Sequence, residues 1–236
     1  MQKSIFITGL TDGIPIALGY LAVSFSFGIA AVAAGLSPFE AILISMTNLT
    51  SAGQFAGIGI ITGGGSYFEL ALSQFIINLR YALMGISLSQ KLDKSFSRLH
   101  TVLLGHMLTD EIFAVSASRT KPVRPLYFFA LSLLPYWGWA AGTAAGAFFG
   151  QLLPENLCMA LSVAIYGMFI AIIVPAVKDN YKIAIVTLIA VAISCCLYYI
   201  PAFDKVSGGF SIIICAVAAS AAGAFIFPVK EEEENE

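Results

Sequence analysis

The stretch Tyr67–Gln90, YFELALSQFIINLRYALMGISLSQ, decides the fold class because it places an arginine inside a long apolar segment. Its length and composition predict a membrane-spanning helix, which needs about 20 mostly apolar residues. A charge at mid-membrane costs roughly 2.5–3.5 kcal/mol on insertion scales, so we expect Arg80 to face a partner or a watery cavity. Further polar residues occur in this and neighbouring apolar segments: Asn78, Gln54 and the triplet Thr109-Asp110-Glu111.

The composition is that of a membrane protein. Of the 236 residues, 58% are hydrophobic and only 11% are charged, and the mean hydropathy is +0.88. Soluble domains carry about 25% charged residues, so a water-soluble fold is excluded. The formal net charge of -2 gives no basic field for nucleic acid. We expect a single transmembrane domain over residues 1–229 and a solvated, acidic cytoplasmic tail over residues 230–236.

Seven stretches are long and apolar enough to span a membrane, which predicts an all-α polytopic fold. They are Ile14–Gly35, Phe39–Thr62, Tyr67–Gln90, Leu126–Gly150, Leu157–Val177, Ile183–Pro201 and Phe210–Pro228. An eighth stretch, Leu99–Ala117, is shorter and more polar, because it contains two histidines and the Thr-Asp-Glu triplet. We predict that it is a re-entrant or broken segment, with eight full spans as the alternative.

Basic loop residues decide the predicted orientation. Six flank the polar stretch, two lie in a later loop and one is in the tail: Lys91, Lys94, Arg98, Arg119, Lys121, Arg124, Lys178, Lys182 and Lys230. If Leu99–Ala117 enters and leaves on one side, all nine fall in the cytoplasm, as the positive-inside rule favours. Seven spans then place the N-terminus outside and the C-terminus inside, and Lys3 opposes this arrangement.

An internal repeat is faintly visible in two loops. Gly35-Leu36-Ser37-Pro38-Phe39-Glu40 precedes the second predicted span, and the similar Gly150-Gln151-Leu152-Leu153-Pro154-Glu155 precedes the fifth. Related three-helix units that are separated by three spans would be inverted, as in many transporters. A chance match between two proline-bearing loops is the alternative.

The second predicted span changes composition along its length. Thr47, Thr50, Ser51 and Gln54 are spaced to share one helical face, and glycines follow from Gly53 onward. A polar stripe followed by glycines suits a discontinuous helix whose freed backbone groups bind solute. The alternative is a close helix contact through glycines, with the hydroxyl groups bonded to their own backbone.

Arg80 needs a partner from outside its own helix. Glu69 is eleven residues away, about 16 Å along a helix, so the two cannot pair within it. The candidates are Asp110, Glu111, Asp12 and the carboxylate of a substrate. A purely structural ion pair is the alternative, and both hypotheses hold if a substrate competes for that pair.

Two further polar motifs have a functional and a structural interpretation. His106 and Asp110 are one turn apart, which suits a proton relay in a membrane, whereas groups near the interface would simply be hydrated. Asp12-Gly13-Ile14-Pro15 resembles a helix start, with Asp12 as the N-cap and proline in the first turn. Asp12 facing a cavity is the other hypothesis.

Small and aromatic residues mark the stretch that begins at Leu126. Gly142, Gly146 and Gly150 form two successive Gly-xxx-Gly steps, which predict close packing against another helix of this chain or of a partner subunit. Trp137 and Trp139, with Tyr136 beside them, are predicted to anchor that span at a membrane interface.

The sequence carries no signature of metal, cofactor or enzymatic chemistry. Its four cysteines lack a His or Cys neighbour at ligand spacing. An intramembrane hydrolase with Ser116 or Ser118 and a histidine is a weak alternative, because the Gly-x-Ser-x-Gly elbow is missing. We therefore expect no catalytic residue, no metal ligand and no cofactor.

Five short motifs together resemble the AzlC-type proteins, the large subunit of bacterial branched-chain amino acid exporters. In chain order they are Asp12-x-x-Pro15, Phe27-Gly28, Ser51-Ala52-Gly53-Gln54-Phe55, Asn78-Leu79-Arg80-Tyr81 and Thr109-Asp110-Glu111. The resemblance covers nearly the whole chain and is most specific in the first half. It implies a multi-pass exporter of branched-chain or similar neutral amino acids in the bacterial inner membrane, driven by the proton gradient. It also implies a small AzlD-type membrane subunit as partner.

The residues suggest roles within such an exporter. Arg80, helped by Asn78, or the broken-helix N-terminus near Ser51 and Gln54 would hold the substrate carboxylate. The coupling proton would be carried by one of three carboxylates: Asp12, Asp110 or Glu111. A channel is the alternative, in which flux follows only the gradient of the solute.

Overall fold

The protein is all-helical in the part that the computed structural model describes. That part comprises residues 2–152 and 180–228, with positions 154, 170, 173–174 and 177–178 between them. Within it the regular elements are helices, joined by one isolated bridge between Leu92 and Val123. The predicted all-α fold class is therefore confirmed for the described residues.

The helices group into two compact units, each described by itself. The helices are α1 (Gln2–Ala33), α2 (Pro38–Thr47), α3 (Ala52–Thr62), α4 (Tyr67–Ser89), α5 (Arg98–Gly105), α6 (Asp110–Ala117), α7 (Pro125–Phe149), η1 (Gly150–Leu152), α9 (Tyr181–Tyr199), η2 (Pro201–Phe203) and α10 (Gly208–Ile226). The first unit is Met1–Ile58 with Asn78–Tyr166, and the second is Gly59–Ile77 with Gly167–Glu236.

Four described helices are long and apolar enough to cross a membrane. They are α1, α4, α9 and α10. With these helices the chain is a multi-pass membrane protein. Helix α7 is also long, at 25 residues, and it packs along α1.

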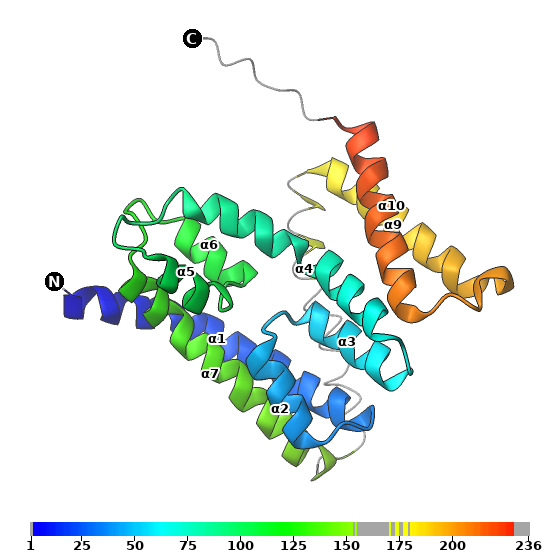
Figure 1. The fold of residues 1–236 in the computed structure, drawn as a ribbon, viewed down its shortest axis with the longest axis horizontal. Coiled ribbons are helices and arrows are strands. Elements are labelled where there is room, and N and C mark those ends of the chain that lie inside the picture. Colours follow the sequence, from blue (N-terminus) through cyan, green and yellow to red (C-terminus); the bar gives the residue numbers. More distant parts are fainter. Residues whose placement is uncertain are drawn as a thin grey trace. The chain divides into compact units, whose positions relative to one another are not determined.

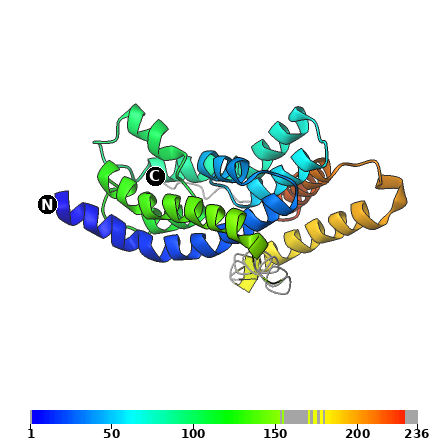
Figure 2. The ribbon, with the colours of Figure 1, turned by 90° about the horizontal axis from the view of Figure 1, so that it is seen from below.

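Helices α1 and α7 lie side by side and run in the same direction (Figures 1 and 2). The glycines of α7 carry this contact: Gly138 faces Ala17, Gly146 faces Phe25 and Gly150 faces Ile29. The residue numbers of the contacting positions increase together along both helices, so α1 and α7 are parallel. The predicted packing face is confirmed, and its partner is a helix of the same chain.

The predicted second span is a helical hairpin that turns back. Helix α2 begins near the C-terminal end of α1, where Ala41 packs. The chain that follows α2 reaches Leu49, which packs with Tyr20 and Trp139 halfway along the α1–α7 pair. After the break at residues 48–51, α3 returns, because Ile58 joins the cluster that holds Ala41 (Figure 1). We call α2, the break and α3 the first hairpin.

Two corrections follow from the first hairpin. The discontinuity was predicted correctly, but the prediction that Phe39–Thr62 crosses the membrane is wrong, because α2 and α3 have 10 and 11 residues. Such helices are about 15 Å long, half the hydrocarbon thickness. The predicted common face of Thr47, Thr50, Ser51 and Gln54 is also lost, because residues 48–51 are not helical.

The polar stretch Leu99–Ala117 forms a second hairpin, made of α5 and α6, which enters from the opposite end. Helix α5 starts beside the basic loops and ends at His106, whose ring meets that of Tyr136 halfway along α7. Helix α6 starts beside Tyr20 and returns to the loops, where the Lys91 ammonium donates to the Ala117 carbonyl. The break that we predicted in this stretch is confirmed.

The two hairpins change the predicted orientation. Each hairpin returns to the end of the α1–α7 pair from which it starts, so neither hairpin carries the chain from one end of the pair to the other. The N-terminal turns of α1 therefore lie at the same end as the basic loops, where Arg119 approaches Asp12. The prediction that the N-terminus and these loops lie on opposite sides is wrong, and Lys3 no longer opposes the positive-inside rule.

Two local predictions for aromatic and capping residues are also wrong. Helix α1 runs unbroken from Gln2 through Pro15, so Asp12 is an interior helical residue and not an N-cap. Membrane helices tolerate an interior proline because neighbouring groups satisfy the freed backbone carbonyl. Trp139 is 2% exposed and packs edge-on against Tyr20, so it is a core residue and not an interfacial anchor.

Some predictions fall on residues outside the described part of the chain. The predicted span Leu157–Val177 lies there almost entirely, so the total number of spans stays a prediction. The loop that contains Glu155 and the acidic tail lie there as well, so the repeat and the tail also stay predictions.

Candidate functional site

The tips of the two hairpins meet the same aromatic residues in the middle of the first unit. Tyr136 donates through its hydroxyl to the Met46 carbonyl, 3.0 Å away at the end of α2, and its ring faces His106 at the tip of the second hairpin. Tyr20 contacts the first tip through the cluster with Leu49 and lies 2.6 Å from the Thr109 hydroxyl of the second. Tyr20 and Tyr136 thus connect both tips.

Arg80 and Asp110 form an ion pair beside these tips. One guanidinium nitrogen lies 3.0 Å from a carboxylate oxygen of Asp110, and the side chains are 42% and 36% exposed. The guanidinium also stacks over the ring of Tyr81, 5.0 Å from its centroid, and donates to its hydroxyl. Of the four candidate partners, Asp110 is the one that pairs with Arg80, and the partial exposure of the pair leaves room for a third group.

Glu111 is bound by hydroxyl groups. Its carboxylate accepts a hydrogen bond from Tyr20, whose hydroxyl also contacts Thr109. Among the described residues, no Arg or Lys forms an ion pair with Glu111 within 4.0 Å. Sequence reasoning missed Tyr20, because a tyrosine in an apolar helix gives no signal until its hydroxyl partner is known.

Asp12 belongs to a separate cluster near the N-terminal end of α1. It accepts a hydrogen bond of 2.7 Å from Tyr127 and lies 3.7 Å from the Arg119 guanidinium, which stacks on the Tyr127 ring. Asp12 is therefore a counter-ion of Arg119 and not the partner of Arg80. Arg119 was identified in the sequence only as a basic loop residue.

Gln54 supports the break of the first hairpin. Its side chain is 1% exposed, and its amide nitrogen donates to the Ser45 hydroxyl, 3.0 Å away on the opposite arm. Ser45 in turn lies 2.7 Å from the Thr143 hydroxyl of α7. The Ser51 N–H donates to the side-chain oxygen Oε1 of Gln54 at 3.3 Å, and Ser51 has a φ of 48°. This chain of hydrogen bonds fixes the turn at the hairpin tip.

The predicted site residues thus fall into three groups within the first unit. Arg80, Asp110 and Glu111 lie at the second hairpin tip, with Asn78 two residues before Arg80 in α4. Ser51 and Gln54 hold the first tip, as described above. Asp12 lies in its own cluster near the basic loops. The predicted relay from His106 to Asp110 stays a prediction, since Asp110 faces Arg80.

A buried carboxylate also occurs in the second unit. Glu69 is 4% exposed and accepts hydrogen bonds from the Ser207 hydroxyl and from the Gly209 N–H, the latter at 3.1 Å. These donors lie at the start of α10, where the helix dipole favours a negative charge. Glu69 therefore ties the start of α4 to that of α10.

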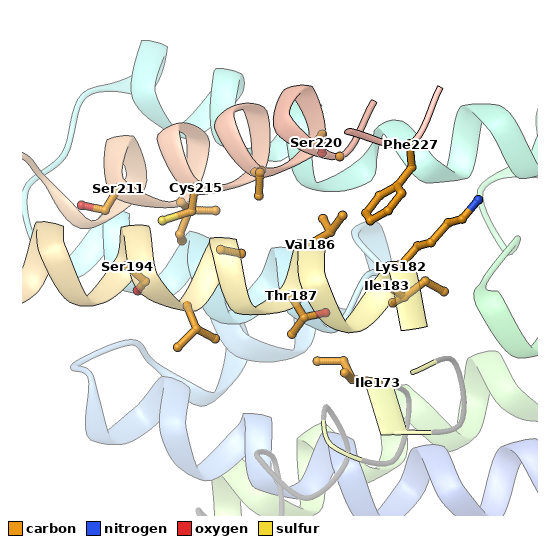
Figure 3. Close-up of a pocket in the computed structure, with 16 residues that line it drawn as sticks. Ile173, Lys182, Ile183, Val186, Thr187, Ser194, Ser211, Cys215, Ser220 and Phe227 are labelled. Carbon is orange, nitrogen blue, oxygen red and sulfur yellow. The ribbon is translucent and has the colours of Figure 1, made fainter. Parts of the chain in front are cut away.

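A cavity of about 800 Å³ lies between α9 and α10 in the second unit (Figure 3). Aliphatic side chains such as Val186 and Ile183 line it, together with a few hydroxyl groups, and Lys182 lies at one end. The described lining contains none of the predicted site residues. The predicted substrate-binding residues of the described chain thus lie at the hairpin tips of the first unit and not in this cavity.

Comparison with known proteins gives a consistent result. The family model described as AzlC protein matches residues 15–153, which include both hairpins. An uncharacterized membrane protein of Archaeoglobus fulgidus is 32% identical over 195 residues, which cover 82% of this chain and 85% of that protein.

Two further relatives align over a shorter region. The inner membrane protein YgaZ of Escherichia coli is 31% identical over 157 residues, 64% of this chain and 63% of that protein. The branched-chain amino acid transport protein AzlC of Bacillus subtilis is 24% identical over 146 residues, 61% of this chain and 57% of that protein. The chain thus spans less than two thirds of either relative. No solved structure matches the chain significantly.

Proposed function

Since the chain belongs to the AzlC family of membrane transport proteins, we propose that it exports branched-chain or related neutral amino acids across the cell membrane. The relative from Bacillus subtilis is named a branched-chain amino acid transport protein, which supports this substrate class. The observation that carries the proposal is the meeting of two opposed hairpin tips beside the Arg80–Asp110 pair. Transporters commonly bind substrate where broken helices meet near the bilayer midplane.

The ion pair is chemically complementary to an amino acid. The planar Arg80 guanidinium suits the substrate carboxylate, and Asp110 suits its ammonium group. In this proposal a bound amino acid lies between the two side chains. Its carboxylate contacts Arg80 and its ammonium group contacts Asp110, so each charge keeps an opposite charge beside it. Helices α3 and α6 begin at the tips, and their positive ends add to the attraction for a carboxylate.

The surroundings of the site suit a neutral, aliphatic side chain. Leu49, Trp139 and Tyr20 form an apolar cluster at the first tip. A charged substrate side chain would need an additional counter-ion in a low-dielectric environment, which is costly. Asn78 and the group formed by Ser51 and Gln54 would orient the polar end of the substrate.

Counter-charges distinguish the three candidate carboxylates for proton coupling. Protonation of Asp12 or Asp110 would leave a paired arginine without its counter-ion inside an apolar protein, which is unfavourable. Glu111 accepts a hydrogen bond from the Tyr20 hydroxyl, which is not a cation. We therefore assign the coupling proton to Glu111, because it forms no ion pair within 4.0 Å among the described residues, so its protonation separates no such pair.

Opposed hairpins also suit alternating access. Each hairpin reaches the site from one end of the α1–α7 pair, so each could open a path to one side of the membrane. A small AzlD-type subunit completes the proposed exporter, as the family resemblance implies. With Leu157–Val177 as a crossing helix, six crossings would place both termini in the cytoplasm.

Amino acid efflux tests the proposal. Cells preloaded with labelled leucine, isoleucine or valine would express the chain alone or with its small subunit, with and without a protonophore. We expect efflux from cells that express the chain together with its small subunit, and we expect a protonophore to change the rate of that efflux. Efflux that follows only the amino acid gradient would indicate a channel. No efflux from a demonstrably inserted complex would refute the substrate class.

A further inference from the structure

Two adjoining cavities in the first unit lie at the end of α1 that carries the basic loops. They share Ile5 and Arg124. One has a volume of about 530 Å³ and is lined by Ser4, Ile5, Thr8, Asp93, Arg119, Lys121, Pro122, Arg124 and Tyr127. The other has a volume of about 840 Å³ and is lined mainly by the apolar residues Leu103, Leu104, Met107, Leu126 and Phe129. A polar cavity thus continues into an apolar one.

The polar cavity has a surplus of positive charge. Of its three cationic residues, Arg119 is paired with Asp12, and Arg124 lies 3.8 Å from the Asp93 carboxylate. Lys121 is exposed and has no ion pair among the described residues. This cavity therefore attracts an anion, and the guanidinium groups have the donor geometry that binds phosphate oxygens.

The start of α7 adds to this attraction. The helix begins at Pro125, directly after Arg124, and no side chain caps it. Its first N–H groups and its dipole therefore favour a negative charge at the rim of the polar cavity. Lysine and arginine side chains and two hydroxyl-bearing residues therefore line the polar cavity, and the start of α7 follows directly after one of the arginines.

The apolar cavity opens towards the outside of the first unit. Leu103 is 55% exposed and Phe129 is 37% exposed, although both are large and apolar. Exposed apolar side chains at the membrane-embedded surface of a protein contact lipid, and a groove between them has the chemistry to accept a hydrocarbon chain. A free phosphate or a soluble phosphorylated metabolite would fill only the polar cavity.

We propose that the two cavities together bind an anionic phospholipid from the cytoplasmic leaflet. Its phosphate would lie between Arg119, Lys121 and Arg124, and one acyl chain would lie along Leu103 and Phe129. Juxtamembrane basic pockets bind the phosphate of lipid headgroups in this way. Because α5 lines the apolar cavity, a bound lipid would contact the second hairpin and stabilise its position. This site does not depend on which solute is transported.

Thermal unfolding of the full-length protein in a neutral detergent tests the site. The probes are dioleoyl phosphatidylglycerol, dioleoyl phosphatidylcholine with the same chains, and glycerol 3-phosphate, which has no chain. We expect phosphatidylglycerol alone to raise the unfolding temperature at low concentration. Equal stabilisation by glycerol 3-phosphate would overturn the lipid site in favour of a phosphate site. Equal stabilisation by phosphatidylcholine would show that charge is not recognised.

Two double variants, each lacking two positive charges, test where phosphatidylglycerol binds. The double substitution Lys121→Gln with Arg124→Gln should weaken phosphatidylglycerol binding. We expect the lipid concentration that gives half of the full rise in unfolding temperature to increase about fivefold for each cation removed. The control, Lys94→Gln with Arg98→Gln, removes the same charge at two nearby positions that line neither cavity. Equal weakening in both variants would overturn the proposal. Lys121→Gln alone, at an exposed position, keeps the test valid if loss of Arg124 impairs folding.

Discussion

Gly146→Ala tests the parallel α1–α7 pair on which both hairpins pack. A Cβ on Gly146 would lie 2.8 Å from the carbonyl carbon of Phe25 and nearer still to its oxygen. Ordinary contacts begin at 3.4 Å, so the two backbones would have to separate by more than 0.6 Å. The obstacle is backbone, which cannot rotate away as a side chain can. Overpacking of this kind costs about 1–3 kcal/mol, and we expect the upper end of that range.

The assay is reversible unfolding in mixed detergent micelles, followed by the fluorescence of Trp139, which packs in this region. The matched control is Gly19→Ala on α1, where a new Cβ would meet no atom within 4 Å. This control should be neutral or stabilising by up to about 1 kcal/mol, because alanine favours helix more than glycine does. Equal stability of the Gly146→Ala variant and the control would refute the close backbone packing.

Three further predictions concern carboxylates. Glu111→Gln should abolish net proton-coupled export while solute exchange persists, measured in proteoliposomes with and without a pH gradient; unchanged coupling would move the proton to another group. Glu69→Ala should leave the donors at the start of α10 unsatisfied, at a cost of about 1–3 kcal/mol. Faster amide hydrogen exchange at Gly209 would report this loss, and unchanged exchange would contradict it. Hydrogen bonds from Ser95 hold the pKa of Asp93 below its usual range, with a smaller contribution from Arg124. The contribution of Asp93 to stability is present above about pH 4 and is lost as the pH falls through its lowered pKa, so Asp93→Asn should lower the unfolding temperature at neutral pH and not in strong acid.

The sequence predicts the polar centre of the protein better than its path through the membrane. An arginine in an apolar helix needs a partner or a watery cavity, so Asp110 could be named from the sequence alone as one of the candidates. The run from Thr47 to Gln54 likewise predicts a helix break. Whether the chain continues or turns back after a break depends on contacts with other helices, which no local pattern encodes. A stretch of 24 apolar residues fits one crossing or two half-length arms equally well.

The same limit explains the errors at Asp12 and Trp139. An aspartate shortly before a proline is typical of a helix start, but the contact with Arg119 and Tyr127 accommodates the carboxylate inside α1. Trp139 follows another tryptophan, which is typical of an interfacial belt, whereas Tyr20 buries it in the core. In both cases the tertiary partner decides the environment, and that partner is distant in the sequence.

The most direct test of the account is substrate exchange by three variants of the complete transporter in proteoliposomes: Arg80→Gln, Asp110→Asn and the double substitution. The single changes each leave one charge without its partner, and the double substitution removes both. If Arg80 binds the substrate carboxylate, leucine exchange is lost in Arg80→Gln and in the double variant, although the double variant is stable. Recovery of leucine exchange in the double variant would show that the pair is only structural and would contradict the proposed site.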